Sequence, residues 1–240
     1  MRCDDFICLG RTVPEESKKY GAKVCMAGVS REFGSLMRVY PLPVVNPIRA
    51  RHECVLELER NHQDSRRESW KLKDRTSGIV SVSPKQAVDP NGLATILRPF
   101  ISRSIDELND RRASLGVLEL QGSPRGFFRE RSGVMHPDQG ALFAVADECF
   151  GANSIDIAPY IEFWDQDEKH HELQIREWGC YEWIRKDRSN ASVLWDNLGL
   201  NGTKPIWAVV GNQANRRSSW LIIKTFAIPF EHQAEMFPAA

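Results

Sequence analysis

Hydrophobic and polar positions alternate over much of the first 60 residues. Residues 4–10 and 22–29 are short apolar runs, and residues 52–61 alternate so that Cys54 and Leu58 share one face. A period of two is typical of half-buried strands. With a tight turn over residues 30–34, the pattern predicts an antiparallel meander at the start of the chain.

The stretch SLMRVYPLPVV, residues 35–45, contains the most informative of these strands. Arg38 and Tyr40 share one face because side chains alternate along a strand. Pro41 and Pro43 cannot donate to a ladder, so pairing is predicted to end at Tyr40. A guanidinium and a phenol at a strand end suit a planar or phosphorylated ligand, and the alternative is an arginine paired with a nearby carboxylate.

Helices are predicted mainly in the middle and late parts of the chain. The clearest covers residues 102–116, where Ser104 and Glu107 fit a capping box and Gly116 suits the C′ position. Three further helical stretches are predicted, at residues 138–151, 172–188 and 192–202.

Strands are predicted between and after these helices. They cover residues 117–120, 126–131, 158–164, 205–211 and 219–230, and the last two form the strongest hairpin. Residues 61–78 are polar and are predicted as a loop, and no internal repeat is visible. The chain is therefore predicted to be α+β, a single domain over residues 1–240 with a mainly antiparallel sheet and a helical block in its middle and late part.

The composition narrows the function without identifying it. The chain has 32 Lys plus Arg and 32 Asp plus Glu, so its net charge gives no overall field for collecting nucleic acid, although a local basic groove is compatible with it. No run reaches signal-peptide length or the roughly 20 apolar residues that span a bilayer. The 6 cysteines include no CxxC pair. A cytoplasmic protein with reduced thiols and no membrane partner is expected.

Familiar cofactor and catalytic motifs are absent. The chain lacks GxxxxGK[ST], GxGxxG, HExxH and GxSxG, so no cofactor is expected. Acids and adjacent histidines lie together in residues 165–172, but neighbouring histidines in a strand point to opposite sides, so a solvated run is favoured over a metal site. Glu57 and Glu59 lack the spaced lysine that a metal-dependent nuclease would need.

Arginines recur beside aromatic residues, an arrangement that suits nucleic-acid binding. Arg66 and Arg67 precede a tryptophan, and Arg216 and Arg217 precede another in a loop that also contains Asn212. Guanidinium groups grip phosphate and stack on rings, and aromatic faces accept unstacked bases. These residues, with Arg38 and Tyr40, are the candidate nucleobase or phosphate ligands, and the alternative is a solvated surface over a core of aromatic residues.

Two cysteines have neighbours that could support nucleophilic chemistry. Cys180 lies close in sequence to Glu177 and Glu182, and Cys25 lies on a predicted strand before a glycine. A cysteine nucleophile needs a thiolate and an activating group. Buried structural thiols are the alternative for both.

Four segments carry a resemblance to a known group. They are KVCMAGVSREFGSLMRVYPLP, DSRRESWKL, REWGCYEWIRK and VVGNQANRRSSWLIIKTFAIP. The chain resembles an uncharacterised prokaryotic family linked to DNA-modification and defence clusters, and is similar to accessory proteins that convert the nitrile of a 7-cyano-7-deazaguanine base in DNA to the amide. The family pattern has a version with cysteines before the position of His171, and this chain lacks them, so a metal role does not carry over.

The resemblance implies a DNA or nucleobase-containing ligand and partner proteins from the same gene cluster. For nitrile hydration, Cys25 and Cys180 would be the thiols, Glu177 and Glu182 the acid and base, and Arg38 and Arg67 the clamps, with the other candidate arginines on the ligand.

Three hypotheses follow. The protein is an enzyme acting on a modified nucleobase, a non-catalytic reader of nucleic acid or of a modified base, or a structural subunit of a larger complex. Turnover of the base would distinguish the enzyme from the reader. Copurification with a partner, without binding to free DNA, would favour the structural subunit.

Overall fold

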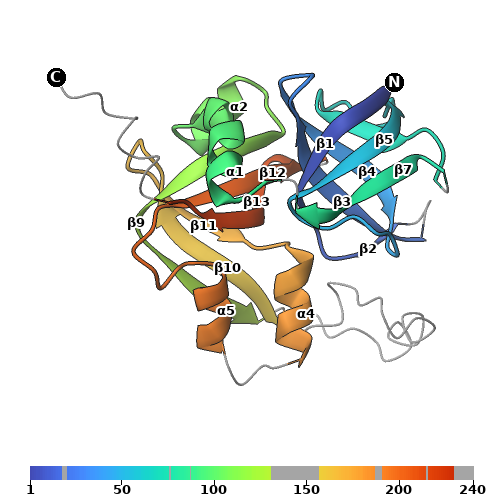
Figure 1. The fold of residues 1–240 in the computed structure, drawn as a ribbon. Coiled ribbons are helices and arrows are strands. Elements are labelled where there is room, and N and C mark those ends of the chain that lie inside the picture. Colours follow the sequence, from blue (N-terminus) through green and yellow to red (C-terminus); the bar gives the residue numbers. More distant parts are fainter. Residues whose placement is uncertain are drawn as a thin grey trace.

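Two β-sheets pack side by side in the computed structural model (Figure 1). The structure describes residues 1–17, 21–75, 77–86, 88–130, 157–186, 191–214 and 216–229. Each sheet curls around its own hydrophobic interior, and a third hydrophobic cluster joins the two.

The first sheet closes into a five-stranded barrel. Its strands are β1 (Arg2–Arg11), β3 (Gly21–Ser30), β4 (Ser35–Pro43), β5 (His52–Arg60) and β6 (Ser69–Leu72), with β2 (Glu15–Ser17) and β7 (Ile79–Gln86) added at the sides. The ring runs β1-β3-β4-β6-β5 and returns to β1, and only the β4–β6 pair is parallel. In order of sequence this is 1-2-3-5-4-1, the connectivity of the OB fold, a Greek-key barrel.

The second sheet is a half-barrel with the same order of connections. It contains β8 (Ile101–Ser102), β9 (Leu115–Glu130), β10 (Ile157–Trp164), β11 (His170–Gln174), β12 (Ile206–Gln213) and β13 (Arg216–Ala227). The sheet order is β11-β10-β9-β12-β13, and a parallel bridge between Ile175 and Ile222 brings the end of β11 to β13. The two units therefore repeat one topology. No sequence repeat was visible because a barrel strand requires alternating burial, not particular residues.

The helices are short and lie outside the sheets. They are α1 (Pro90–Leu97), the 3₁₀ turn η1 (Arg98–Phe100), α2 (Ile105–Asp110), α4 (Trp178–Lys186) and α5 (Ala191–Asn197). Ser104 caps α2 by accepting the Glu107 N–H at 3.2 Å, which confirms that predicted cap. None of the helices among the described residues is long and apolar enough to cross a membrane.

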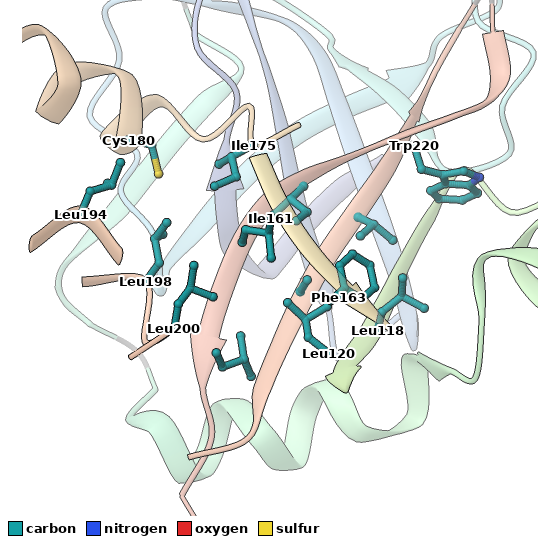
Figure 2. Close-up of a cluster of buried hydrophobic side chains, with 14 of the residues drawn as sticks. Leu118, Leu120, Ile161, Phe163, Ile175, Cys180, Leu194, Leu198, Leu200 and Trp220 are labelled. Atoms are coloured by element: carbon teal, nitrogen blue, oxygen red, sulfur yellow. The ribbon is translucent and has the colours of Figure 1, made fainter. Parts of the chain in front are cut away.

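Helices α4 and α5 cover the open interior of the half-barrel (Figure 2). Phe163 of β10 and Leu118 of β9 point into the same cluster as Cys180 of α4 and Leu194 of α5. The sheet alone would leave this surface in water, so the helices supply the missing wall.

The third cluster explains why several strands are apolar on both faces. In β1, Phe6 and Cys8 fill the barrel interior, whereas Ile7 and Leu9 face outward into the cluster shared with Trp207 of β12. Burial of both faces gives a nearly continuous hydrophobic run instead of strict alternation. Whether the two units fold as one domain stays a prediction.

The predicted α+β class was wrong. The structure is 55% strand and 16% helix, arranged as a barrel and a half-barrel and not as one antiparallel sheet with a helical block. Residues 172–188 begin as β11 before α4, and the predicted loop at 61–78 contains β6. The periods of strand and helix are hard to separate in runs this short. The helix predicted at 138–151 lies outside the described residues.

Two predicted boundaries also moved. The helix over 102–116 is limited to Ile105–Asp110, and Gly116 belongs to the long strand β9. Strand β4 continues through both prolines to Pro43, instead of ending at Tyr40. The β3–β4 register shifts between Val24 and Met26, which leaves an irregularity around Tyr40 and Pro41. Proline is tolerated at such a bulge because no ladder donor is required there.

Candidate functional site

A cavity of about 480 Å³ lies where the half-barrel covers one side of the barrel. The barrel contributes residues from β2, β3, β4 and the loops after β1 and β5, and the half-barrel contributes β12, the loop after it, β13 and the residues just after β11. The lining residues are Thr12, Glu15, Cys25, Arg38, Tyr40, Arg66, Arg176, Gly211, Asn212, Gln213, Ala214, Leu221 and Ile223.

The barrel side of the cavity is the surface that OB folds use for ligands. Oligonucleotides and oligosaccharides bind across strands 2 and 3 and the loops between strands 1 and 2 and strands 4 and 5. In this chain those strands are β3 and β4, which present Cys25 and Arg38. The first connection contains the short strand β2 and presents Glu15, and the second presents Arg66. The topology and the cavity therefore point independently to one surface.

Arg38 lies at the centre of this surface and is only 3% exposed. Its Nη1 donates to the carbonyl oxygen of Asn212 at 3.0 Å, and its Nη2 donates to the carbonyl oxygen of Ser114. Both acceptors belong to the half-barrel side. Among the described residues, no carboxylate lies within salt-bridge distance of Arg38, and its buried Nε has no hydrogen-bond partner.

Asn212 faces Arg38 from the end of β12 and is 4% exposed. Its Nδ2 donates to the carbonyl oxygen of Ala113 at 3.2 Å, which fixes the orientation of the side-chain amide. Its buried Oδ1 has no partner in the described structure. Gly211 precedes it, and a Cβ there would lie 2.8 Å from Cδ1 of Ile223 and 3.1 Å from Nη2 of Arg38. Glycine allows β12 to come this close.

Arg66 reaches the cavity from the loop between β5 and β6. Its Nε donates to both carboxylate oxygens of Asp64 at 2.8 and 3.0 Å, and its Nη1 donates to the carbonyl oxygen of Asn212 at 2.7 Å. Ser69 adds a 2.6 Å hydrogen bond to Asp64. The Arg66–Asp64 pair is 7% and 9% exposed and orders the loop itself, and the bond from Arg66 to Asn212 joins the loop to the half-barrel.

Arg176 enters from the half-barrel and is ion-paired with Glu15 of the barrel. It also occupies a position related to that of Arg38. The backbone N–H of Arg38 donates to the carbonyl of Glu68 next to the fifth barrel strand, and that of Arg176 donates to Ile222 in the fifth strand of the half-barrel, each at 2.7 Å. Arg38 extends from the third barrel strand and Arg176 from just after the third strand of the half-barrel, and each side chain contacts the other unit.

The charges of the cavity are unevenly balanced. Arg66 and Arg176 each have a carboxylate partner, whereas Arg38 is held by neutral carbonyl oxygens. Among the described residues Arg38 therefore has no carboxylate in direct contact, although its charge counteracts the rise that burial causes in the pKa of the nearby Asp64. A buried guanidinium of this kind favours hydrogen-bond acceptors around it.

Cys25 lines the cavity, but its thiol is not poised for attack. Burial raises its pKa to about 11, with the nearby Arg38 opposing this shift and Glu15 adding to it. At neutral pH the group is therefore a neutral thiol, whereas nucleophilic attack requires a thiolate.

The other residues proposed for catalysis lie elsewhere. Cys180 belongs to the half-barrel core, where burial and the carboxylate of Glu177 raise its thiol pKa well above the usual value. Glu177 is ion-paired with Lys224, and Glu182 accepts a hydrogen bond from Trp178 Nε1 at 3.3 Å. Glu177 and Glu182 line a second cavity, of about 250 Å³. The structure does not bring Cys25 and these three residues into one site.

Of the seven candidate ligand residues, Arg38, Tyr40, Arg66 and Asn212 line the cavity, and three do not. Arg67, Arg216 and Arg217 are exposed. Arg217 donates to Ser65 Oγ at 2.6 Å and lines a neighbouring cavity of about 220 Å³. These arginines lie outside the main cavity, on neighbouring surface.

Sequence reasoning missed several lining residues, among them Thr12, Glu15, Arg176 and the apolar pair Leu221 and Ile223. Arg176 carried no usable signal, because β11, which precedes it, has the mostly polar sequence HHELQ. The others carried none either, because their place in the cavity depends on how the two units meet.

The histidine run does not form a metal centre in the described structure. His171 contacts Asp165 at 2.7 Å, and His170 contacts Glu162 at 2.9 Å. Within the described residues, no group of three or more potential ligands gathers in a metal-binding arrangement.

The fold and cavity define a protein of two OB-like units with a cavity between them. In comparisons with known proteins, residues 4–92 match the model of a family described as a domain of unknown function, DUF8758. The matched range covers the barrel and ends within α1. No curated protein and no solved structure matches the chain.

Proposed function

We propose that this protein is a reader that binds an unpaired nucleobase of nucleic acid in the cavity between its two units. The observation that carries the proposal is the buried Arg38 on the ligand surface of an OB barrel, without a carboxylate partner and beside the unpartnered Oδ1 of Asn212. OB folds use this surface for nucleic-acid strands.

The size and lining of the cavity support a base. Its volume of about 480 Å³ lies in the range of small-molecule sites. Tyr40, Leu221 and Ile223 supply ring and aliphatic surfaces for a planar ligand, and stacking on an aromatic ring contributes about 1–3 kcal/mol per base. A base in a duplex cannot reach such a site, so the ligand is unpaired or extruded.

Binding is favoured over nitrile hydration because the thiol that lines the cavity is protonated at neutral pH and the second thiol lies in a core. The DNA-modification setting, partner proteins from the same gene cluster and a cytoplasmic location are parts of this proposal. The described cysteines, Cys3, Cys8, Cys25, Cys54 and Cys180, are all free, which supports a reducing compartment.

The test is fluorescence anisotropy with a labelled single-stranded DNA and the same sequence as a duplex. We expect the single strand to bind and its affinity to fall as salt rises, because phosphate contacts release counterions. Tyr40→Ala should weaken binding about tenfold, whereas Arg103→Ala, at an exposed arginine paired with Asp167, should change it less than twofold. If the two variants bind the single strand with equal affinity, the strand does not bind in this cavity and the proposal is wrong.

Mass spectrometry of nucleosides tests the catalytic alternative. The protein would be incubated with DNA that carries the nitrile-bearing base, and the digested nucleosides would be compared with an untreated control. An unchanged mass is expected for a reader. A gain of one water would establish the hydration enzyme and reject the reader.

A further inference from the structure

We infer that the small cavity beside the main one binds a backbone phosphate of the strand whose base enters the main cavity. The inference rests on the proposed function and places the part of the nucleotide that the main cavity does not take. The small cavity, of about 220 Å³, is lined by Asn109, Arg112, Ala113, Asn212 and Arg217. Asn212 lines both cavities, so the two adjoin, as a base and its own phosphate require.

The lining of the small cavity carries positive charge and, among the described residues, no carboxylate. Arg112 and Arg217 are both exposed, so a ligand can reach their side chains. Within the described part of the chain neither is ion-paired, and the Nη2 of Arg217 donates to the neutral Ser65 Oγ at 2.6 Å. Guanidinium groups bind phosphate oxygens through charge-assisted hydrogen bonds, so this lining favours an anion.

The arginines of the main cavity suit a phosphate less well. Arg66 and Arg176 each pair with a carboxylate, and Arg38 is 3% exposed and bonded to two carbonyl oxygens. A phosphate in the main cavity would have to displace these partners. The small cavity needs no such exchange, so the phosphate is assigned to it and the base to the main cavity.

The backbone at Arg112 is fixed in a conformation that favours glycine. Its φ is 52°, directly after the C-cap residue of α2. Arg112 N–H donates to the Asn109 carbonyl and Ala113 N–H to the Leu108 carbonyl, each at 2.9 Å, which are the two bonds of a Schellman cap. Asn212 Nδ2 donates to the Ala113 carbonyl and ties the cap to β12. Arginine where glycine is the usual residue points to a role for its side chain.

Asn109 adds a neutral donor to the two guanidinium groups. Its Oδ1 accepts from Trp220 Nε1 of β13 at 2.9 Å, which leaves the Nδ2 of this exposed side chain to donate to a ligand. Among the described residues this Nδ2 has no acceptor. A phosphodiester donates no proton and presents two charged oxygens, so it matches a lining that consists of donors.

The test compares two double variants that remove the same charge. Arg112→Gln with Arg217→Gln removes the two arginines of the small cavity. Arg111→Gln with Arg216→Gln removes their exposed neighbours in the sequence, which do not line it. Binding of labelled oligo(dT) and oligo(dA) would be followed by fluorescence anisotropy over a range of salt, and melting temperatures would show whether each variant is folded.

We expect the Arg112/Arg217 variant to bind both strands about tenfold to a hundredfold more weakly, by one factor for both, because a phosphate contact is independent of the base. The slope of log K against log salt should become less negative by about 0.7, the value for one phosphate of a single strand. The Arg111/Arg216 variant should keep the wild-type slope. Arg112→Gly should also weaken binding without lowering the melting temperature, because glycine suits the positive φ.

The outcomes separate this inference from the proposed function. If the two double variants bind alike while Tyr40→Ala weakens binding, the phosphate site is overturned and base binding stands. If the loss differs between oligo(dT) and oligo(dA), the arginines contact the base and the inference fails. If inorganic phosphate displaces oligo(dT) beyond a chloride control of equal ionic strength, the site takes free phosphate and its assignment to the strand is wrong. If only the Arg112/Arg217 variant weakens binding, the phosphate contact stands and the base proposal fails. If no single strand binds, both fail.

Discussion

Arg38 offers the sharpest test of how the two units are joined. Its guanidinium makes two hydrogen bonds across the boundary, to the carbonyl oxygens of Asn212 and Ser114. Arg38→Lys keeps the charge but replaces the planar fork with a single ammonium group, so one of the two bonds is expected to be lost.

The magnitude follows from the partners that remain. A hydrogen bond from a charged group contributes about 1.5–3 kcal/mol. The loss should not exceed this range, because each carbonyl keeps a second donor: Asn212 N–H lies 3.1 Å from the Ser114 oxygen, and Arg66 Nη1 lies 2.7 Å from the Asn212 oxygen. For a chain of this size, the free-energy loss corresponds to a fall in melting temperature of roughly 3–12 °C.

Thermal and urea unfolding followed by tryptophan fluorescence would measure the effect, since Trp207 and Trp220 are buried at 2% and 5% exposure. Arg103→Lys is the matched control, because that arginine is exposed and its pair with Asp167 is screened by solvent, so its contribution to stability is expected to be small. If Arg38→Lys unfolds at the same midpoint as the control, the bonds across the boundary contribute little and the reasoning is refuted.

Three further predictions follow from the same structure. Gly28→Ala should destabilise the protein by about 1–3 kcal/mol or more, because a Cβ would lie 2.1 Å from the Phe6 ring. In the control Gly92→Ala, in α1, the new Cβ meets nothing closer than 3.4 Å, so that variant should be neutral or stabilising. Equal urea midpoints for the two variants would contradict this prediction. Glu68→Ala removes the hydrogen bonds that the Glu68 carboxylate accepts from Ser114 N–H at 3.1 Å and from Ser114 Oγ at 2.7 Å. A double-mutant cycle with Ser114→Ala should show a coupling free energy of about 1–3 kcal/mol. Additive losses of stability would argue against the contact. The pKa values of Cys25, at about 11, and Cys8, at about 12, are raised from 9.0 by burial, so the folded state holds more protons than the unfolded state above pH 9. Stability should therefore fall as pH rises from about 9 to 12, and the fall should be smaller in Cys25→Ser, as measured by urea midpoints.

Much of the strand content could be predicted from local pattern. The predicted strands at residues 4–10, 22–29 and 52–61 lie within or overlap β1, β3 and β5, and the late hairpin corresponds to β12 and β13. Period-two alternation is a local property, so it is visible in the sequence. Strand β6 was missed because it has four residues, Ser69–Leu72, inside a polar stretch.

The candidate site was recognised in part. Arg38, Tyr40, Arg66 and Asn212 were predicted from residue chemistry and line one cavity, although their roles stay predictions. Grouping Cys25 with Cys180 relied on thiol chemistry alone. Cys25 lines the main cavity and Cys180 lies in the half-barrel core, and no sequence pattern reports the environment that raises a thiol pKa.

The sequence by itself determined where most strands form and that the familiar cofactor motifs are absent, and it offered candidate residues for a polar ligand. Only the tertiary structure decided that the strands close into a barrel and a half-barrel with one topology, and that a cavity lies between the two units. The reason is that ring closure and docking depend on contacts between distant residues, such as Arg38 with Asn212, 174 positions apart. Local alternation sets which faces are apolar, and long-range packing decides what each face meets.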